Sequence, residues 1–281
     1  MIDLARRAFR RLYTYSIPRR LSTSLSDNQA YPHVCMRAAH DFRRFNTFRR
    51  NPIYNQILEH VSTREGAQYL DEIRKSSNVL RAMEEFKRND SYGGPRLVDY
   101  LGVGAVSPTT LRYVKVLADL ERLFGKLDGF RICEVGVGYG GQCRIINAYF
   151  RPATYCLVDI RAALELAKRF LDHFIVHSLL SFKPMNELPS AEYDLAISNY
   201  SFTELPRSIQ DVYLAKAITR AARGYITYNE ITPPHFNSYT RAELLELLPG
   251  ARVLPEIPQT HPRNCIIAWD RSAMEAAPAS L

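Results

Sequence analysis

The residues best suited to chemistry lie in one glycine-rich stretch, 132–141 (ICEVGVGYGG), which follows an apolar run and precedes a helical pattern. Its four glycines are Gly136, Gly138, Gly140 and Gly141. Glycines at this spacing allow a tight turn and let a ligand approach a backbone without Cβ atoms. The helix that follows would present free N–H groups in its first turn. The stretch therefore predicts a site for a nucleotide-containing ligand, with a purely structural turn as the alternative.

Two carboxylates flank this turn. Asp159 ends the next apolar run, eighteen residues after Gly141, where it could accept hydrogen bonds from both ribose hydroxyls. Glu134 lies two residues before Gly136, and its charge would repel the diphosphate of a dinucleotide. Acidic-x-Gly-x-Gly resembles the first motif of class I methyltransferases, in which the carboxylate helps to place the amine of S-adenosylmethionine (SAM). Glu134 therefore favours SAM over NAD, so an NAD-binding oxidoreductase is the weaker alternative.

Alternating strands and helices must position these residues. We expect strands at 130–135, 155–158, 174–177, 193–198, 225–228, 251–254 and 265–269. We expect helices at 107–124, 141–149, 162–170 and 208–220, and one that a capping box opens at Thr240. Such alternation predicts an α/β fold, namely a Rossmann-like sheet of the class I methyltransferase type with helices on both faces. A helical N-terminal region precedes it.

The chain divides by charge into three predicted parts: a basic arm at 1–50, a helical cap at 51–105 and a SAM-binding domain at 106–275. The arm holds eleven Arg and three Asp, and so carries the whole net charge of +8. Because the remainder is neutral, we expect no nucleic-acid groove. Within the arm, we expect an amphipathic helix at 4–15, which could contact an anionic membrane, its own domain or a second subunit, or belong to a transit peptide. Residues 18–50 are otherwise expected to be irregular.

The composition is that of an ordinary soluble protein. The five cysteines show no zinc spacing, and no apolar run is long enough to cross a bilayer. No secretory signal is evident at the N-terminus. We therefore expect a cytoplasmic protein, with peripheral contact at the inner face of the cell membrane as an alternative. The oligomeric state is open.

Several stretches resemble the sugar O-methyltransferases encoded among bacterial surface-polysaccharide genes. The matching stretches are 107–113 (SPTTLRY), 134–142 (EVGVGYGGQ), 158–159 (VD) and 199–204 (NYSFTE), with a looser match at Asn264. The resemblance covers about residues 50–270, and Val137 stands where the family more often has Gly or Ala. It implies SAM dependence and a carbohydrate acceptor, which could be a nucleotide sugar, a lipid-linked glycan or a polysaccharide chain.

Methyl transfer to a hydroxyl needs alignment of the reacting atoms and a base for the proton. Glu204 and His261 are the candidate bases, although Glu204 could merely complement the dipole of the next helix. The further candidates for binding the cofactor are Tyr139, Gln142, Ser178, Asn199, Arg112 and Tyr113. The candidates for binding the substrate are Ser201, Asn229, Glu230 and His235. No trio of acids and histidines has convincing magnesium spacing, so we expect metal independence.

Two other functions stay open at this stage. One is methyl transfer to a non-carbohydrate acceptor, including nitrogen in protein or nucleic acid. Residues 199–202 (NYSF) faintly resemble the loop of amino methyltransferases, but they lack both of its prolines. The other is a binding module without catalysis, against which the intact Glu134 and Asp159 argue.

Overall fold

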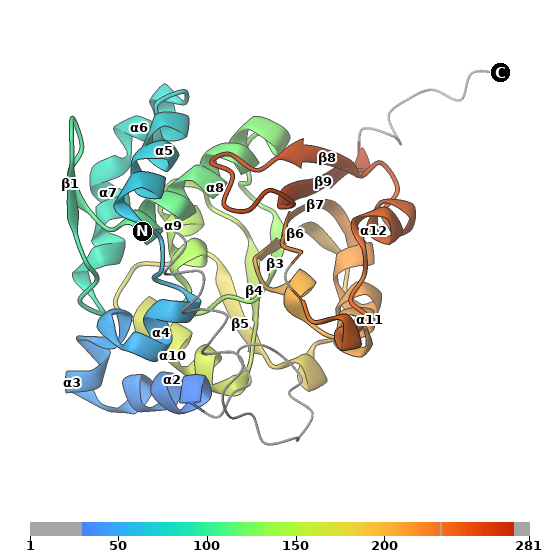
Figure 1. The fold of residues 1–281 in the computed structure, drawn as a ribbon, viewed down its shortest axis with the longest axis horizontal. Helices are drawn as coiled ribbons and strands as arrows, with labels where there is room; N and C mark the ends of the chain where they lie inside the picture. The colour runs from blue at the N-terminus through green and yellow to red at the C-terminus, as the bar shows by residue number, and fades with distance from the viewer. Residues whose placement is uncertain (1–29, 231, 273–281) are drawn as a thin grey trace.

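A seven-stranded sheet with the order β5-β4-β3-β6-β7-β9-β8 forms the centre of the molecule (Figure 1). The computed structural model describes residues 30–230 and 232–272. The strands are β3 (Arg131–Val135), β4 (Thr154–Val158), β5 (Leu179–Lys183), β6 (Tyr193–Asn199), β7 (Ala221–Tyr228), β8 (Arg252–Pro255) and β9 (Cys265–Asp270). Strands β5, β4, β3, β6 and β7 run parallel, whereas β9 is antiparallel to both of its neighbours. The expected Rossmann-like sheet is confirmed.

Helices cover both faces of the sheet. One face packs against α8 (Pro108–Phe124), α9 (Gly141–Tyr149) and α10 (Arg161–Leu171). The other packs against α11 (Arg207–Lys216) and α12 (Arg241–Leu247). Along β3, Ile132 belongs to the first core and Cys133 to the second, because successive side chains of a strand point to opposite faces. Strands covered on both faces therefore read as continuous apolar runs.

The predicted helix starts are confirmed in their details. Ser107 Oγ accepts a hydrogen bond from the backbone N–H of Thr110, and Pro108 is the first residue of α8. At α12, Thr240 and Glu243 form both hydrogen bonds of a capping box. Both devices satisfy backbone N–H groups that a helix leaves free in its first turn.

The expected third strand at 174–177 is wrong. The strand that pairs with β4 is β5, and its register aligns Leu179 with Thr154. Residues 174–177 instead join α10 to β5: Phe174 and Val176 pack against the core, while Ile175 is 85% exposed. Both segments contain short apolar runs, 174–176 (FIV) and 179–180 (LL), so pairing with β4 decides between them.

Residues 30–50 were expected to be irregular, but they are largely helical. They form α2 (Ala30–His40), α3 (Phe42–Phe45) and the 3-10 turn η1 (Phe48–Arg50). Pro32 does not break α2 because it lies in the first turn, where its missing N–H has no partner to lose. Helix α2 packs along α10. The expected helix at 4–15 lies outside the described residues, and the division of the chain at 50 and 105 stays a prediction.

The cap is helical, as expected for 51–88. Its elements are α4 (Pro52–Ile57), α5 (Thr63–Ile73), α6 (Ser77–Arg81), α7 (Met83–Lys87) and η2 (Arg88–Ser91), followed by a hairpin of β1 (Val98–Tyr100) and β2 (Gly104–Val106). The hairpin was not expected from the sequence. Helix α5 packs on α8, and Figure 1 shows the cap beside the same face of the sheet that α8, α9 and α10 cover. The remaining 3-10 turns are η3 (Met185–Glu187), η4 (Phe202–Glu204), η5 (Ile218–Arg220) and η6 (Pro234–Phe236).

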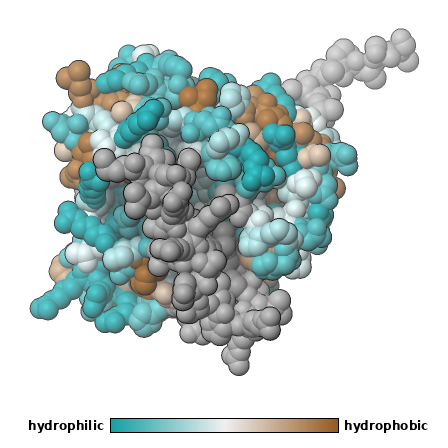
Figure 2. Space-filling view, viewed as in Figure 1, coloured by the Kyte–Doolittle hydropathy of each residue, from teal (hydrophilic) through white to brown (hydrophobic). Residues whose placement is uncertain are grey.

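The surface of the described chain is mixed. Figure 2 shows a largely hydrophilic face with separate small apolar areas, and the most exposed large apolar side chains include Leu101, Ile175 and Phe42. Among the described residues, no helix combines the length and the apolar content that a membrane crossing requires.

Candidate active site

The glycine turn begins where β3 ends. Gly136, Gly138 and Gly140 have φ values of +84°, +54° and +83°, a region that favours glycine. A Cβ atom on Gly136 would lie 2.1 Å from the side chain of Ser201, and one on Gly138 would lie 2.7 Å from Leu58. The glycines are thus needed by the protein's own packing: the tip of β6 covers Gly136 and the cap covers Gly138.

Asp159 lies at the end of β4 beside this turn, as predicted. Its Oδ2 accepts a hydrogen bond from the N–H of Gly138 at 2.9 Å, and its Oδ1 accepts one from Ile160 at 2.7 Å. Each carboxylate oxygen has a second lone pair, and the side chain is partly exposed. Asp159 therefore orients the turn, at the position where the sequence predicts a ribose-binding acid.

Glu134 is a buried acid beneath the turn. Its exposed fraction is 2%, and the hydroxyl of Tyr155 donates to its Oε2 at 2.6 Å. Burial raises the pKa of Glu134 to about 8; the Tyr155 hydrogen bond opposes this rise and the charge of Asp159 adds to it. The other oxygen has no hydrogen-bond partner among the described residues. A cationic amine beside it would stabilise the ionised form.

Three residues that were expected to contact a cofactor have side chains that pack within the protein and support the glycine turn. They are Tyr139, Gln142 and Tyr113. The ring of Tyr139 is fully buried and packs edge-on against Phe48 and Phe170. Gln142 donates through Nε2 to the backbone oxygen of Tyr113 at 3.2 Å, and the Tyr113 ring lies against Gly141. The expectation that the side chain of Tyr139 faces a ligand is wrong, because its ring completes the core between α10 and the cap.

A buried ionic cluster around Arg49 ties the cap to the turn, and nothing in the sequence pattern signalled it. Arg49 donates to Glu59 at 2.6 Å, to Asp90 at 2.9 Å and to the hydroxyl of Ser107 at 2.8 Å. Its guanidinium carbon lies 5.0 Å from the ring centroid of Tyr139. Because each donor group meets an acceptor, the buried charge is satisfied.

Ser178 is wrongly expected to contact the cofactor. With β5 beginning at Leu179, Ser178 lies at the amino end of that strand, on the opposite edge of the sheet from the glycine turn. It is buried and donates to Asn147 Oδ1 at 2.7 Å. Its role is to hold α9 against the sheet.

A cavity of about 280 Å³ opens between the cap and the tips of the strands. It brings together three residues expected from the sequence: Arg112, Asn229 and His261. It adds others that the sequence did not reveal, among them His60, Tyr69, Tyr200, Thr260 and Asn264. The cap supplies His60 and Tyr69, and their place in the cavity depends on how α5 docks on α8, for which no local pattern exists.

Tyr200, directly after β6, forms one wall of this cavity. It has a φ of +53°, a strained value for a residue other than glycine. Its hydroxyl donates to the buried carboxylate of Glu256, which also accepts from the backbone and hydroxyl of Thr260 at 2.8 Å. The guanidinium of Arg112 lies 5.5 Å from the ring centroid of Tyr200. These contacts hold a tyrosine in a conformation that a flexible loop would avoid.

Glu204 and Asn229 meet between the tips of β6 and β7. Asn229 Nδ2 donates to Glu204 Oε1 at 2.7 Å, and the Asn229 N–H donates to the hydroxyl of Thr203 at 3.1 Å. Burial raises the pKa of Glu204 to about 7, and the Asn229 hydrogen bond opposes the rise. A carboxylate with such a pKa suits proton transfer near neutral pH.

The remaining expected residues fall into two groups. Asn199 lies at the tip of β6, where its Oδ1 accepts from Thr227 at 3.1 Å and its buried Nδ2 has no partner among the described residues. Ser201 lies over Gly136. Glu230 and His235, by contrast, are exposed and are not among the residues that line the cavity. They point outward because the chain leaves the sheet after β7.

No group of three or more His, Cys, Asp or Glu side chains within 30–230 and 232–272 is placed to share a metal ion. The expectation of metal independence stays a prediction. All five cysteines are buried free thiols.

Comparison with known proteins finds similar solved structures but no matching protein family or curated protein. Among solved structures, it is similar to magnesium protoporphyrin IX methyltransferase from Synechocystis PCC 6803 with bound SAH, at 13% identity and a TM-score of 0.43, covering 66% of this chain and 93% of that one. It is also similar to a SAM-dependent methyltransferase from Aquifex aeolicus, at 19% identity and a TM-score of 0.40, covering 56% and 87%. Similarity at this level says nothing about individual residues.

Proposed function

We propose that the protein is a SAM-dependent methyltransferase that acts on a hydroxyl group of a carbohydrate. The observation that carries the proposal is the pair of carboxylates at the glycine turn. Glu134 is buried with one oxygen free of hydrogen bonds, and the carboxylate of Asp159 lies beside the turn, where it accepts from Gly138. The first suits the amine of SAM and the second suits its ribose diol.

Charge supports SAM over NAD. A diphosphate on this turn would be repelled by the charge of Asp159 and would oppose the ionisation of the buried Glu134. A ligand with an ammonium group reverses the sign and compensates the buried acid. When bound, SAM supplies an electrophilic methyl group on a sulfonium.

Glu204 is the proposed general base. Its pKa of about 7 leaves a large ionised fraction at neutral pH while keeping enough basicity to accept the proton of an alcohol. Asn229 lines the cavity and holds Glu204 through one hydrogen bond. His261 lies on the same cavity and is the second candidate. The loop before β9 carries it to this edge because β9 runs antiparallel to β7.

The cavity lining supports a carbohydrate acceptor. Neutral polar groups and aromatic rings dominate it, including Tyr69, Tyr200 and Thr260. The buried amide oxygens Asn229 Oδ1 and Asn264 Oδ1 have no hydrogen-bond partner among the described residues. Since buried acceptors are normally paired, they favour a ligand that offers several hydroxyl donors.

Two experiments test this function in sequence. Isothermal titration with SAM, S-adenosylhomocysteine (SAH) and NAD should show binding of the first two alone. Transfer of a labelled methyl group from SAM should then be measured with nucleotide sugars, lipid-linked glycans and oligosaccharides, and with tRNA and protein as controls. Binding of NAD alone would end the methyltransferase proposal. Methylation of tRNA or protein alone would reject the carbohydrate acceptor and keep the rest.

A further inference from the structure

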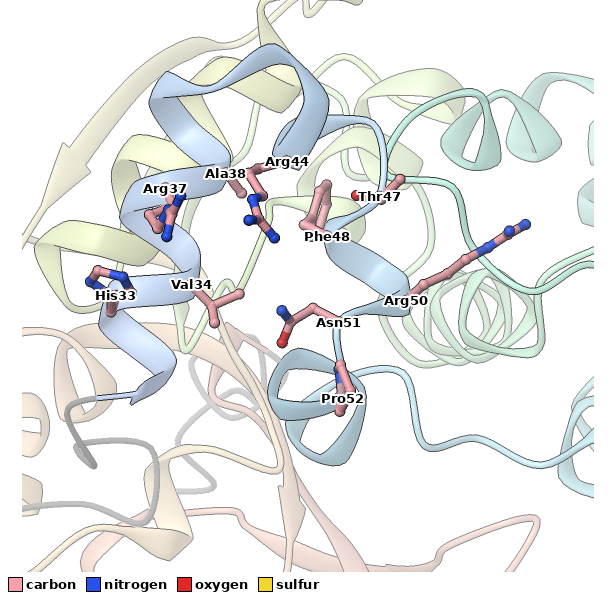
Figure 3. Close-up of a pocket in the computed structure, with 10 residues that line it drawn as sticks. All are labelled: His33, Val34, Arg37, Ala38, Arg44, Thr47, Phe48, Arg50, Asn51 and Pro52. Carbon is pink, nitrogen blue, oxygen red and sulfur yellow. The ribbon is translucent and has the colours of Figure 1, made fainter.

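A second cavity, of about 380 Å³, lies in the N-terminal part of the described chain (Figure 3) and shares no lining residue with the cavity above. It opens between α2, α3, η1 and the start of α4. Its basic lining consists of His33, Arg37, Arg44 and Arg50, and none of its lining residues in the described part of the chain is acidic. Figure 3 shows Val34, Arg44 and Asn51 pointing into the enclosed space. The surrounding surface over α2 and α3 is largely hydrophilic in Figure 2.

The arginine charges at this cavity are only partly compensated, by the charge of Asp41. Arg37 and Arg44 form no ion pair with any acid in the described part of the chain. The neighbouring Arg49 shows the contrast, because Glu59 and Asp90 neutralise it. The nearest acid is Asp41, whose exposed carboxylate accepts from the backbone N–H of Arg44 and caps α3.

Other groups at the cavity also favour an anion. The side-chain oxygen of Asn51 accepts from the N–H groups of Ile53 and Tyr54, which leaves its amide nitrogen to donate. Arg50 differs from the other arginines, since it extends away from the cavity and donates to the backbone oxygen of Pro95 at 3.4 Å. The donors that point into the space are therefore Arg44 and Asn51, and Arg37 lines it as a third.

The lining and the volume of this cavity indicate the class of ligand that it could bind. Val34 and Phe48 give the cavity an apolar wall beside its guanidinium groups. Guanidinium groups bind phosphate oxygens through paired hydrogen bonds, and a volume of about 380 Å³ leaves room for more than one phosphate. We propose that this cavity binds the phosphate or diphosphate group of an organic ligand through Arg37 and Arg44. The proposal does not depend on the methyltransferase activity.

The chain supplies a matched control for this site. Arg43 and Arg44 are neighbours on α3 with equal charge, and both are exposed, but only Arg44 lines the cavity. Inorganic pyrophosphate should be titrated into the full-length wild type, Arg44→Ala, Arg37→Ala and Arg43→Ala at fixed salt. We expect saturable binding that weakens at least about tenfold in Arg44→Ala and in Arg37→Ala, with Arg43→Ala close to wild type.

Other arginines on the protein also attract pyrophosphate without binding it at this site. The test is therefore the difference in pyrophosphate affinity between Arg44→Ala and Arg43→Ala. Equal weakening in both, or no saturable binding in the wild type, would overturn the proposal. Co-sedimentation with phosphatidic acid vesicles separates the two sources of phosphate. Vesicle binding that Arg44→Ala loses and Arg43→Ala keeps identifies a lipid headgroup. Pyrophosphate binding without vesicle binding identifies a soluble phosphate ester.

Discussion

Asn229 Nδ2 donates a hydrogen bond of 2.7 Å to Glu204 Oε1, which joins the tips of the neighbouring strands β6 and β7. The bond holds the Glu204 carboxylate against Asn229, which lines the cavity. It also limits the rise of the Glu204 pKa. Glu204 is thereby held in place without a full countercharge, as a base for a weakly acidic hydroxyl requires. The predictions about the reaction start from this pair.

Glu204→Gln should abolish most turnover without affecting the cofactor. The amide keeps the size of the side chain but accepts no proton at neutral pH, so kcat should fall by about 10²- to 10⁴-fold. Calorimetry should give an unchanged SAH affinity, because the side-chain hydrogen bond of Glu204 is to Asn229 and not to the glycine turn. If Glu204→Gln keeps full activity while His261→Asn loses it, His261 is the base.

The pH dependence of kcat/KM should report Glu204. Only the ionised carboxylate accepts a proton, so the rate should rise as the pH increases through about 7 and then level off. Asn229→Ala removes the hydrogen bond that lowers this pKa, so the rising limb should move to higher pH. A limb that stays in place in Asn229→Ala would show that another group sets it.

Glu134→Gln should stabilise the free protein at alkaline pH. The pKa of Glu134 is about 8 in the folded state and about 4.3 when unfolded. Between these values the unfolded chain has released a proton that the folded chain keeps, so the group's contribution to stability falls as the pH rises. The Tm of Glu134→Gln should be close to that of the wild type at pH 4, and it should exceed the wild-type Tm by a growing margin as the pH rises towards 8.

Thermal melts of wild type and Glu134→Gln across this pH range test the sign. The effect of Glu204 is common to both proteins and cancels in the difference. A Tm difference that does not change with pH would mean that the Glu134 carboxyl is not desolvated in solution. Glu134→Gln should in addition weaken SAH binding, since the amide offers the ligand amine no charge.

Asp159→Ala should weaken SAH binding by about 1–3 kcal/mol, through the lost ribose contact and the lost acceptor for Gly138 N–H. Asp159→Asn keeps one side-chain oxygen that can accept from Gly138, and so serves as the matched control. We expect it to fall between wild type and Asp159→Ala in calorimetric titrations. Unchanged affinity in Asp159→Ala would place the ribose elsewhere.

The sequence predicted what local signals determine. The turn at Gly136–Gly141, the acid at Asp159 and the start of α8 at Pro108 depend on short-range patterns, and the structure has them where they were expected. The position of Glu204 near the tip of β6 was also expected, because Glu204 follows that strand by only a few residues in the sequence.

What the sequence did not reveal depends on tertiary packing. His60 and Tyr69 reach the cavity only because the cap docks on α8. Tyr139 reads as a ligand contact in a glycine loop, but its ring turns into the core. The position of β5 depended on pairing with β4, so Ser178 was assigned to the wrong edge of the sheet.

A crystal structure of the complex with SAH tests the central claim most directly. We expect the ligand amine within hydrogen-bond distance of the Glu134 carboxylate and the ribose hydroxyls on Asp159, with the sulfur facing the cavity that Asn229 lines. A complex with no ligand density over the glycine turn, or with the adenosine far from Asp159, would contradict the account.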